Sequence, residues 1–469
     1  MAAAQRSILC VDIGTSSIKG ALVNQDGVII DWDREYLLSG IWEDFENWDP
    51  RRWVDAFARL TARLQNRDKA DALAISGNGP TLVPIDPDGN PLGNALMWID
   101  KRARSIAGEK SFFLPKIKWL AEEQPELYES TSLFLPCSEY LAYVLTGEAA
   151  AVTPSTEFSP YLWTPEGVTR YGIEPEKLPP LVGTGELLGC IRKKKAEQFD
   201  LPENLPVYTS GSDFIMALLG TGTIRPGITC DRAGTSEGIN HCTTAPVKSG
   251  RLRTLPHIVE GLYNVAGILS STGRVFEWFR KMSGQERISY LDMLTQIASL
   301  PHKIDKPIFL PSLHIGPTWE FSGGAFMELQ PSHGNREMGR AVVESIGFAI
   351  RDLIETMEEQ GCRIPELRVS GGQARNPVWN QMKADITGRR VLVPEVIDSE
   401  LLGSAACSLL GMGEFDSLIS ASDALVRFGD IFEPNPKEHE GFTDSYHDFV
   451  EISRRIVGVI PAYRRMASK

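Results

Sequence analysis

The sequence predicts an α/β protein built from two copies of one domain, with a cleft between the copies. Each half opens with apolar strands that lead into a polar turn containing glycine, at residues 11–17 in the first half and 232–236 in the second. The first opening is antiparallel, unlike the parallel start of a dinucleotide-binding fold. The repeat of this pattern after mid-chain is what indicates duplication.

Turn and capping signals predict the elements of the first half in order. Asp26-Gly27 is a hairpin signal between two strands. Asp49 and Pro50 predict a helix start, because aspartate caps helices and proline fits their first turn. The expected elements are strands at 7–11, 18–23 and 28–32, a helix from 50, strands at 72–76 and 95–99, a helix at 140–146, a strand at 207–210 and a helix at 214–219. Residues around 105–200 are expected to be a helical, loop-rich insertion that carries substrate contacts.

The second half begins after Pro226-Gly227, which predicts domains at 1–227 and 228–469. Its clearest helix is expected at 337–360, where apolar residues recur at helical spacing and Gly361 ends the run. A helix at 401–410 carries a stripe of small residues, which we expect to pack in the core rather than to bind a ligand. The other expected elements are a strand at 228–233, a strand at 367–369, a helix after Pro377 and a strand at 391–393.

Composition and charge exclude several classes of protein. The net charge of −13 argues against nucleic acid or an anionic membrane as the main partner. The seven scattered cysteines form no C-x-x-C pair, so neither a disulfide framework nor a cysteine zinc site is indicated. No apolar run is long enough to span a bilayer, and Asp12 interrupts the only early apolar stretch. We therefore expect a cytoplasmic protein with reduced thiols.

Three polar turns, at residues 11–17, 232–236 and 370–376, are candidate anion sites. Glycine lets backbone N–H groups approach an anion, and Thr and Ser side chains add donors. Asp12 adds a carboxylate, which suits Mg²⁺. A single turn of this composition is more often only a tight turn, but their order over both halves fits two turns that hold a triphosphate and a third that holds a nucleoside. The chain has no Walker A motif and no G-x-G-x-x-G after a strand.

Asp213 is the candidate general base. It lies on a short Gly-Ser turn that opens a helix, where a carboxylate can face a cleft and accept a proton from a hydroxyl. The alternative, that Asp213 only caps the helix, stays open on the residues alone.

With these motifs the chain resembles the FGGY family of carbohydrate kinases, within the larger group that includes hexokinase and actin. The resemblance covers nearly the whole chain. It rests on residues 12–19 (D-I-G-T-S-S-I-K), 48–50 (W-D-P), the W-x-D-x-R stretch at 98–102, residues 211–213, 234–236 and 273–278, and most specifically on 371–377 with 385–389.

The resemblance implies two ribonuclease-H-like domains that close on ATP, Mg²⁺ and a sugar or polyol. It assigns Asp213 as the base and Asp12 as the metal ligand, directly or through water. The remaining implied contacts are Thr15, Ser16, Gly234, Thr235, Gly273, Glu277, Gly372 and Asn376 for the nucleotide, and Asn78, Trp98, Asp100 and Arg102 for the substrate. Asp100 and Arg102 either bind sugar hydroxyls or only pair with each other, and both interpretations stay open.

The departures from the family pattern concern the acceptor. Residues 76–80 read Ser-Gly-Asn-Gly-Pro, without the Met-His of xylulokinases or the Arg-Glu of glycerol kinases, and Glu237 stands where a small residue is usual. A neutral amide at Asn78 suits neutral hydroxyls. The overall pattern is most similar to xylulokinase-like members, so a ketopentose such as xylulose is the first expectation, with another polyol or an aldonate (glycerol, gluconate) as the alternative.

Two other functional classes stay open at this point. One is a nucleotide-dependent switch on the same fold, and the other is a sugar-binding homologue without turnover. Asp213 and the stretch at 98–102 argue against the switch, and Asp12 together with Asp213 argues against the pure binder. The sequence does not give the oligomeric state, and a homodimer stays open.

Overall fold

The computed structural model of the protein describes residues 5–37, 47–100, 102–103, 108–301, 305–311, 321 and 323–456. Within these ranges the chain forms two structural units. Unit 1 is drawn from Met1–Ile224, Pro256–Gly261 and Asp398–Arg427, and unit 2 from Arg225–Leu255, Leu262–Ile397 and Phe428–Lys469. The expected boundary at 227/228 therefore differs from the structure chiefly in one respect: a late segment, Asp398–Arg427, belongs to unit 1.

Unit 1 is built on a six-stranded mixed sheet in the order β3-β2-β1-β4-β10-β9. The pairs β1–β2, β2–β3 and β10–β9 are antiparallel, whereas β1–β4 and β4–β10 are parallel. The strands are β1 (Ser7–Ile13), β2 (Ser17–Asn24), β3 (Ile29–Tyr36), β4 (Ala72–Gly77), β9 (Leu187–Cys190) and β10 (Pro206–Ser212). Two small sheets, β5 (Leu82–Ile85) with β6 (Leu133–Pro136) and β7 (Ala151–Thr153) with β8 (Leu181–Gly183), complete the strands of this unit.

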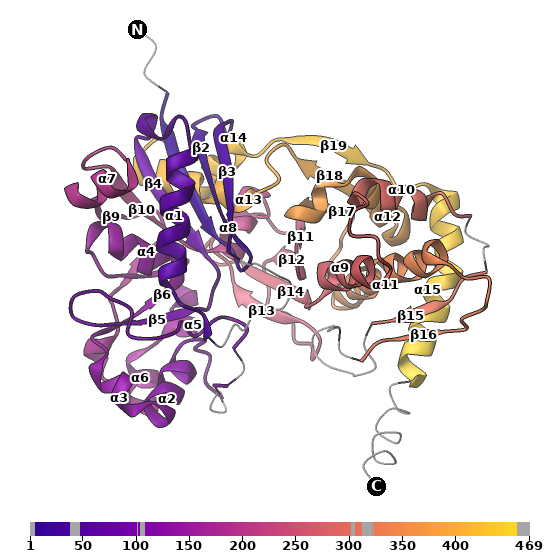
Figure 1. Cartoon of the computed structure of the whole chain (residues 1–469), viewed down its shortest axis with the longest axis horizontal. Coiled ribbons are helices and arrows are strands. Elements are labelled where there is room, and N and C mark those ends of the chain that lie inside the picture. The colour runs from indigo at the N-terminus through magenta and orange to yellow at the C-terminus, as the bar shows by residue number, and fades with distance from the viewer. Residues whose placement is uncertain are drawn as a thin grey trace. The chain divides into compact units, whose positions relative to one another are not determined.

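Helices pack on this sheet from distant parts of the chain. The helix α1 contacts β2 and β3, α4 contacts β4 and β10, and α13 contacts β1, β2, β4 and β10. The α-helices of unit 1 are α1 (Arg51–Arg63), α2 (Leu114–Glu123), α3 (Pro125–Ser130), α4 (Cys137–Thr146), α5 (Ser159–Leu162), α6 (Pro165–Tyr171), α7 (Lys193–Phe199), α8 (Asp213–Gly220), α13 (Ser399–Gly411) and α14 (Leu418–Leu425). Figure 1 shows α13 and α14, in the colour of late residues, beside the early strands.

Unit 2 repeats the plan with a seven-stranded sheet in the order β13-β14-β12-β11-β17-β18-β19. Again a meander of antiparallel strands (β11, β12 and β14) lies beside parallel strands (β11, β17 and β18). The strands are β11 (Thr229–Ala233), β12 (Glu237–Thr243), β13 (Arg253–Pro256), β14 (Tyr263–Leu269), β17 (Glu366–Ser370), β18 (Arg390–Pro394) and β19 (Phe428–Phe432), with a separate pair β15 (Ile308–Leu310) and β16 (Ala325–Met327).

The long helix α11 (Asn335–Glu359) is central to the core of unit 2. Its apolar residues, among them Val342, Ile346, Ile350 and Ile354, are buried in one cluster with side chains of the sheet and of the neighbouring helices. The other α-helices of unit 2 are α9 (Thr272–Met282), α10 (Tyr290–Ala298), α12 (Pro377–Thr387) and α15 (Pro436–Ile456).

The expected duplication of an α/β domain is confirmed by the shared strand order of the two sheets. Most expected elements also form: the helix ended by Gly147 runs from Cys137 to Thr146, and Gly147 has the left-handed backbone predicted for it. The strand expected at 95–99 is wrong. Ala95 and Leu96 form only isolated bridges, to Trp48 and Leu82, because the chain then turns and the N–H of Asp100 donates to the carbonyl of Met97.

The small residues of α13 pack against α8, as expected for a core stripe. A Cβ atom added to Gly403 would lie 2.0 Å from the carbonyl oxygen of Met216 on α8, and one added to Gly220 would lie 1.8 Å from that of Ser399. The two backbones therefore approach too closely for any side chain at these positions. This contact attaches the late segment to the early part of unit 1.

We predict that Gly403→Ala destabilises unit 1 by about 1–3 kcal/mol, the usual range for overpacking a filled core. Gly250→Ala is the matched control, since a Cβ atom there would meet no heavy atom of the described chain within 4 Å. Thermal unfolding followed by circular dichroism compares the two variants. Equal melting temperatures for both would contradict the close packing of α13 on α8.

Candidate functional site

Three parallel strands bring the predicted catalytic side chains of unit 1 to one edge of its sheet. Asp12 on β1 lies beside Ser76 on β4, and Ser212 on β10 lies beside Gly77. Asn78 directly follows β4, and Asp213 directly follows β10. The carboxyl ends of parallel strands meet at one edge, which is where open α/β sheets bind ligands. Asp12, Asn78 and Asp213 are therefore neighbours at this edge.

Asp12 is 2% exposed and is held by charged and polar partners. Its Oδ1 accepts a hydrogen bond of 2.9 Å from the Ser76 hydroxyl, and its Oδ2 lies 3.8 Å from the Lys19 ammonium. Lys19 also lies 3.1 Å from Asp398 and 4.0 Å from Glu400, at the start of α13. Burial alone would lower the pKa of Lys19, but the carboxylates of Glu400, Asp12 and Asp398 outweigh it and raise that pKa. Lys19 is therefore a stable cation beside Asp12.

A chain of hydrogen bonds joins the substrate loop to the first polar turn. The Asn78 amide donates to the carbonyl of Ile13 at 3.0 Å and accepts from the Thr81 hydroxyl at 2.6 Å. The Thr81 hydroxyl accepts from the backbone N–H of Trp98 at 3.0 Å, and the Trp98 indole donates to the Thr15 hydroxyl at 3.0 Å. Asn78 is 3% exposed, whereas Trp98 is 39% exposed. Asn78 thus fixes the loop from beneath, and Trp98 offers an open face.

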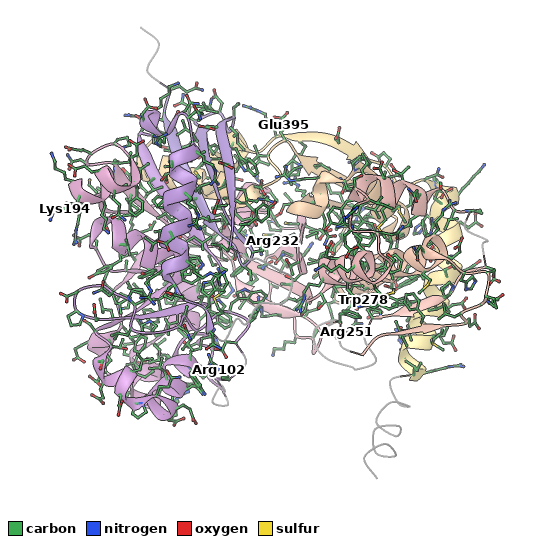
Figure 2. All side chains as sticks on the ribbon, viewed as in Figure 1. Arg102, Lys194, Arg232, Arg251, Trp278 and Glu395 are labelled. Carbon is green, nitrogen blue, oxygen red and sulfur yellow. The ribbon has the colours of Figure 1, made fainter. Side chains whose placement is uncertain are left out.

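Asp100 and Arg102 form a tight pair in this segment. Figure 2 shows the position of Arg102. The Arg102 guanidinium donates to both carboxylate oxygens of Asp100, at 2.6–3.1 Å. Burial acts to raise the pKa of Asp100, but the hydrogen bonds from Arg102 prevail and lower it. The side chain of Arg102 also lies over the Trp119 ring on α2, at 4.4 Å from its centroid. The pair thus anchors the segment, and this geometry favours the structural interpretation of the two considered from the sequence.

Asp213 is the first residue of α8, and it is 9% exposed. Its Oδ1 accepts a hydrogen bond of 2.7 Å from the N–H of the next residue, Phe214. Gly211, two residues earlier within β10, has φ of +117°, which only glycine adopts readily, and it lies where the pairing of β10 with β4 shifts register. A Cβ atom on Gly79 would lie 3.1 Å from the Cβ of Ser212, so the Asn78 loop passes directly beside the end of β10.

The segments of the second half with predicted nucleotide contacts, at residues 234–236, 273–278 and 371–376, gather within unit 2. The Gln373 amide donates to the carbonyl of Gly234 at 2.9 Å and to the Thr272 hydroxyl at 3.2 Å. A Cβ atom on Gly273 would lie 2.2 Å from the Gly234 carbonyl oxygen, and one on Gly371 would lie 2.5 Å from that of Ala233. Glycine is therefore required where these turns pass each other.

The remaining residues that were predicted to contact the nucleotide differ in their solvent exposure. Gly234, Thr235 and Gly372 are exposed, and Thr15 and Ser16 of unit 1 are half-buried in their own turn. Asn376 caps α12 by accepting from the N–H groups of Val378 and Trp379. Glu277 on α9 accepts from Arg280 at 2.7 Å and from the Tyr290 hydroxyl at 2.5 Å, so its carboxylate is already engaged.

Beneath the Gly234–Ser236 turn lies a buried ionic cluster that the sequence did not predict. The Lys383 ammonium of α12 donates to Asp231 and, at 2.8 Å, to Glu237, and all three side chains are at most 1% exposed. Burial, with a further contribution from Asp231, raises the pKa of Glu237 to about 8. Burial opposes the charge of Lys383, but the two carboxylates prevail and raise its pKa. Glu237, which stands where a small residue is usual in the family, is thus paired with Lys383, 146 positions later in the chain.

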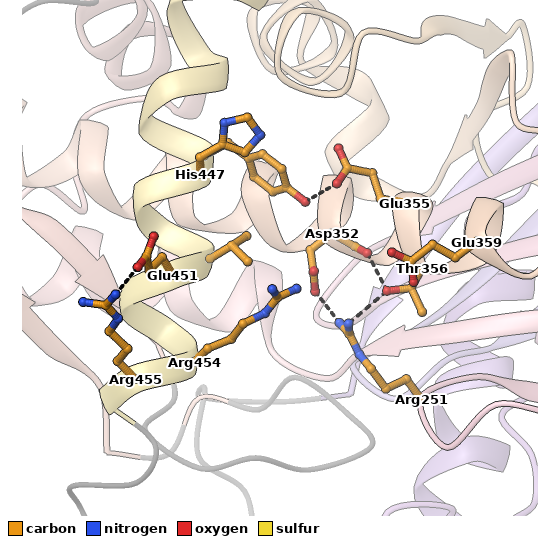
Figure 3. Close-up of a pocket in the computed structure, with 11 residues that line it drawn as sticks. Arg251, Asp352, Glu355, Thr356, Glu359, His447, Glu451, Arg454 and Arg455 are labelled. Carbon is orange, nitrogen blue, oxygen red and sulfur yellow. Dashed lines mark hydrogen bonds and ion pairs between the residues drawn. The ribbon is translucent and has the colours of Figure 1, made fainter.

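A pocket of about 530 Å³ lies elsewhere on unit 2, between α11 and α15 (Figure 3). Its charges pair with one another: Arg251 with Asp352, Arg455 with Glu451, and the Tyr446 hydroxyl with Glu355. The residues that line it include none of the predicted site residues. It is therefore not the candidate site.

Sequence reasoning missed the supporting side chains Ser76, Lys19, Thr81, Lys116 and Lys383. Of these, Lys19 lies within the first quoted motif and was the easiest to find. The others carry no local pattern, because their partners come from elements distant in the sequence.

Comparisons with known proteins agree with this geometry. Residues 7–112 and 108–220 match the N-terminal domain, and residues 232–412 the C-terminal domain, of the FGGY family of carbohydrate kinases. A xylulose kinase of Bacillus subtilis (strain 168) is 25% identical, over 98% of this chain and 99% of its own. An autoinducer-2 kinase of Escherichia coli (strain SMS-3-5 / SECEC) is 26% identical, over 97% of this chain and 95% of its own.

The fold recurs in a solved structure of a gluconate kinase from Lactobacillus acidophilus, with a TM-score of 0.81. That structure is 20% identical and the match covers 97% of this chain and 99% of the other. Among the described helices, none is both long and apolar enough to span a membrane.

We predict a pH signature for the buried cluster. The native state holds a proton on Glu237 that the unfolded chain, with a pKa of 4.5, releases. This contribution to the free energy of unfolding is therefore complete below pH 4.5 and is lost as the pH rises through about 8. Because glutamine does not titrate, wild type should lose thermal stability relative to Glu237→Gln between these two pH values.

Melting temperatures measured by scanning fluorimetry across this pH range test the prediction. Glu359→Gln, at an exposed position of α11, is the control and should follow wild type. Parallel curves for wild type and Glu237→Gln would contradict the raised pKa.

Proposed function

Because the chain belongs to the FGGY family of carbohydrate kinases, whose members transfer phosphate to an alcohol group, we propose that it phosphorylates a ketopentose such as xylulose with ATP. The observation that carries the proposal is the convergence of Asp12, Asn78 and Asp213 at one edge of the unit 1 sheet. Phosphoryl transfer needs an electrostatic cradle, a metal and an oriented nucleophile. Each has candidate residues in this chain.

The nucleotide is proposed to bind unit 2. Gly234 and Thr235 would donate to its phosphates, and Gly372 would lie against the adenosine. Gly372 supports this role, because a Cβ atom there would meet no heavy atom of the described residues within 4 Å. Gly273 would help by its close approach to Gly234, Asn376 by capping α12, and Glu277 by joining α9 to the start of α10 through Tyr290.

Asp12 is proposed to hold Mg²⁺, with Thr15 and Ser16 as donors to phosphate oxygens. The described residues contain no cluster of three metal-ligating side chains. A single carboxylate nevertheless fits Mg²⁺, which keeps several waters and binds one or two carboxylates together with substrate phosphates. When bound, the ion would neutralise charge on the phosphate oxygens.

Asp213 is proposed to accept the proton of the attacking hydroxyl. Its position at the end of β10, beside the Asn78 loop, supports this role. Its side chain accepts from the N–H of Phe214, which fixes one carboxylate oxygen. A carboxylate held in this way needs no reorganisation before it accepts a proton, and such a base typically contributes 10²- to 10⁴-fold.

The acceptor is proposed to lie on the face of Trp98, framed by the Asn78 loop and by the Asp100–Arg102 pair. An exposed aromatic face packs well against the apolar side of a sugar ring or chain. The Bacillus subtilis relative is named a xylulose kinase and the Escherichia coli relative an autoinducer-2 kinase, so relatives of similar identity act on different acceptors. A ketopentose is our choice because the loop at 76–80 carries no charged side chain and has no arginine for glycerol.

The test of the function is ADP release with Mg·ATP over pentuloses, hexuloses, polyols and aldonates. We expect sugar-stimulated turnover with the highest kcat/KM for a ketopentose. Turnover that is independent of sugar would indicate a nucleotide switch, and no turnover would indicate a sugar-binding protein. A tenfold preference for glycerol or an aldonate, about 1.4 kcal/mol, would exclude the ketopentose.

For the nucleotide site, we predict that Gly372→Val weakens ATP binding at least about tenfold, since a branched side chain would occupy the space proposed for adenosine. The fold should tolerate the change, because that space is open in the described chain. Calorimetry with Mg·ATP and the melting temperature are the measurements. Gly250→Val, also in open space, is the control. If Gly372→Val binds ATP with wild-type affinity, the nucleotide does not bind at Gly372.

For the base, we predict that Asp213→Asn lowers kcat by roughly 10²- to 10⁴-fold while the KM for ATP changes little. Asparagine keeps the shape of the side chain and an oxygen that can accept from Phe214, so the melting temperature should hold. Steady-state kinetics with the best acceptor measures both constants. A near-normal kcat in Asp213→Asn would show that Asp213 is not the general base.

A further inference from the structure

One buried ammonium joins the two segments that frame the proposed acceptor site. Lys116 on α2 is 6% exposed. Its Nζ donates to the carbonyls of Pro80 at 2.8 Å, Leu96 at 3.2 Å and Met97 at 2.5 Å. An ammonium has three donors, so all of them are used within this cluster.

These carbonyls belong to the chain segments on either side of the acceptor. Pro80 lies two residues after Asn78, and Met97 directly precedes Trp98. The two segments are also joined by the Thr81 hydroxyl, which donates to Asn78 and accepts from Trp98. Lys116 and Thr81 thus join the Asn78 loop to the Trp98 segment through two independent sets of hydrogen bonds.

The helix α2 holds this region at a second point as well. One turn after Lys116, the Trp119 ring lies under the guanidinium of Arg102, 4.4 Å from its centroid. Arg102 in turn holds Asp100 through both carboxylate oxygens. A single helix therefore supports residues 96–102 at both ends.

We propose that Lys116 is a positioning residue for the acceptor: it sets the distance between the Asn78 loop and the Trp98 segment, and so controls sugar binding without touching the reacting atoms. This inference rests on the proposed function. It predicts a much larger effect on the sugar than on the nucleotide, because most of the proposed nucleotide contacts lie in unit 2.

The charge state of Lys116 gives the proposal a second signature. Burial lowers the pKa of Lys116 to about 8, with Asp100 acting to raise it and Arg102 to lower it further. A neutral amine has two N–H donors for three carbonyls, so one tie is lost as the pH rises through 8. The KM for the sugar should therefore increase on the alkaline side.

The same titration affects stability in the opposite direction. Between about 8 and 10.5 the unfolded chain still binds the proton that the native state has released, so this group makes the free energy of unfolding rise with pH. A higher KM for the sugar between about pH 8 and pH 10.5 is therefore not caused by unfolding.

The chain offers a matched control in Lys177. This lysine is also buried, and its Nζ donates to the carbonyls of Tyr128 at 3.1 Å, Glu129 at 3.4 Å and Thr131 at 2.8 Å. None of the three carbonyls belongs to the loop of Asn78 or to the Trp98 segment. Lys177→Met therefore removes the same kind of interaction at a place with no proposed role.

The experiment measures kcat and KM for the best sugar and for ATP, at pH 7 and pH 9, in wild type, Lys116→Met and Lys177→Met. A displacement of about 1 Å at a reacting centre can cost about 100-fold. We expect kcat/KM for the sugar to fall about 10- to 100-fold in Lys116→Met at pH 7, through KM, with the KM for ATP within about twofold. Lys177→Met should match wild type. The sugar KM should rise from pH 7 to pH 9 in wild type and stay flat in Lys116→Met.

Three outcomes would overturn the proposal. The first is an unchanged sugar KM in Lys116→Met, and the second is a loss that affects sugar and ATP alike or appears equally in Lys177→Met. The third is a sugar KM of wild type that does not change between pH 7 and pH 9. This measurement tests the proposal even if Lys116→Met does not fold. Absence of turnover with every acceptor would refute the function and the positioning role together, whereas turnover with an unaffected sugar KM refutes only the latter.

Discussion

The parallel pairing of β1, β4 and β10 is the constraint on which the acceptor side depends. Asp12, Asn78 and Asp213 are separated by 66 and 135 positions in the sequence, and only the register of these strands makes them neighbours. A shift of one residue would turn every side chain of a strand to the opposite face. The left-handed backbone of Gly211 is equally required, because it forms the register shift of β10 just before Asp213.

The polar turns at residues 11–17 and 232–236 each lie beside a lysine that is shared by carboxylates and is mostly or fully buried. In unit 1, Lys19 lies close to Asp12, Asp398 and Glu400, and in unit 2, Lys383 binds Asp231 and Glu237. Buried charges are costly unless they are paired, and removal of one partner typically costs about 3–5 kcal/mol. Such clusters therefore tolerate only one arrangement, which keeps the backbone N–H groups of the turns fixed before any ligand arrives.

The sequence was sufficient for much of the fold and for the identity of the family. Gly147 ended a helix and the stripe at Gly403 packed in the core because these effects depend on local backbone geometry. Strand 95–99 was predicted wrongly because the chain turns after Leu96, where the N–H of Asp100 donates to the carbonyl of Met97, and Lys116 of a later helix binds the carbonyls of Leu96 and Met97. Thr81 and Lys383 escaped notice for the same reason. A side chain that ties distant segments leaves no periodic trace in the sequence.

The placement of α13 has a consequence for the order of events during synthesis. This helix covers β1, β2, β4 and β10, yet it lies beyond residue 398. At roughly 5–20 residues per second, the nascent chain must wait about 10–40 s between the end of the early strands and the arrival of that helix. Over that interval the four strands lack the packing that α13 later supplies. Because most of unit 2 is inserted between the parts of unit 1, the sheet that begins with the first strands of the chain is completed only late in synthesis.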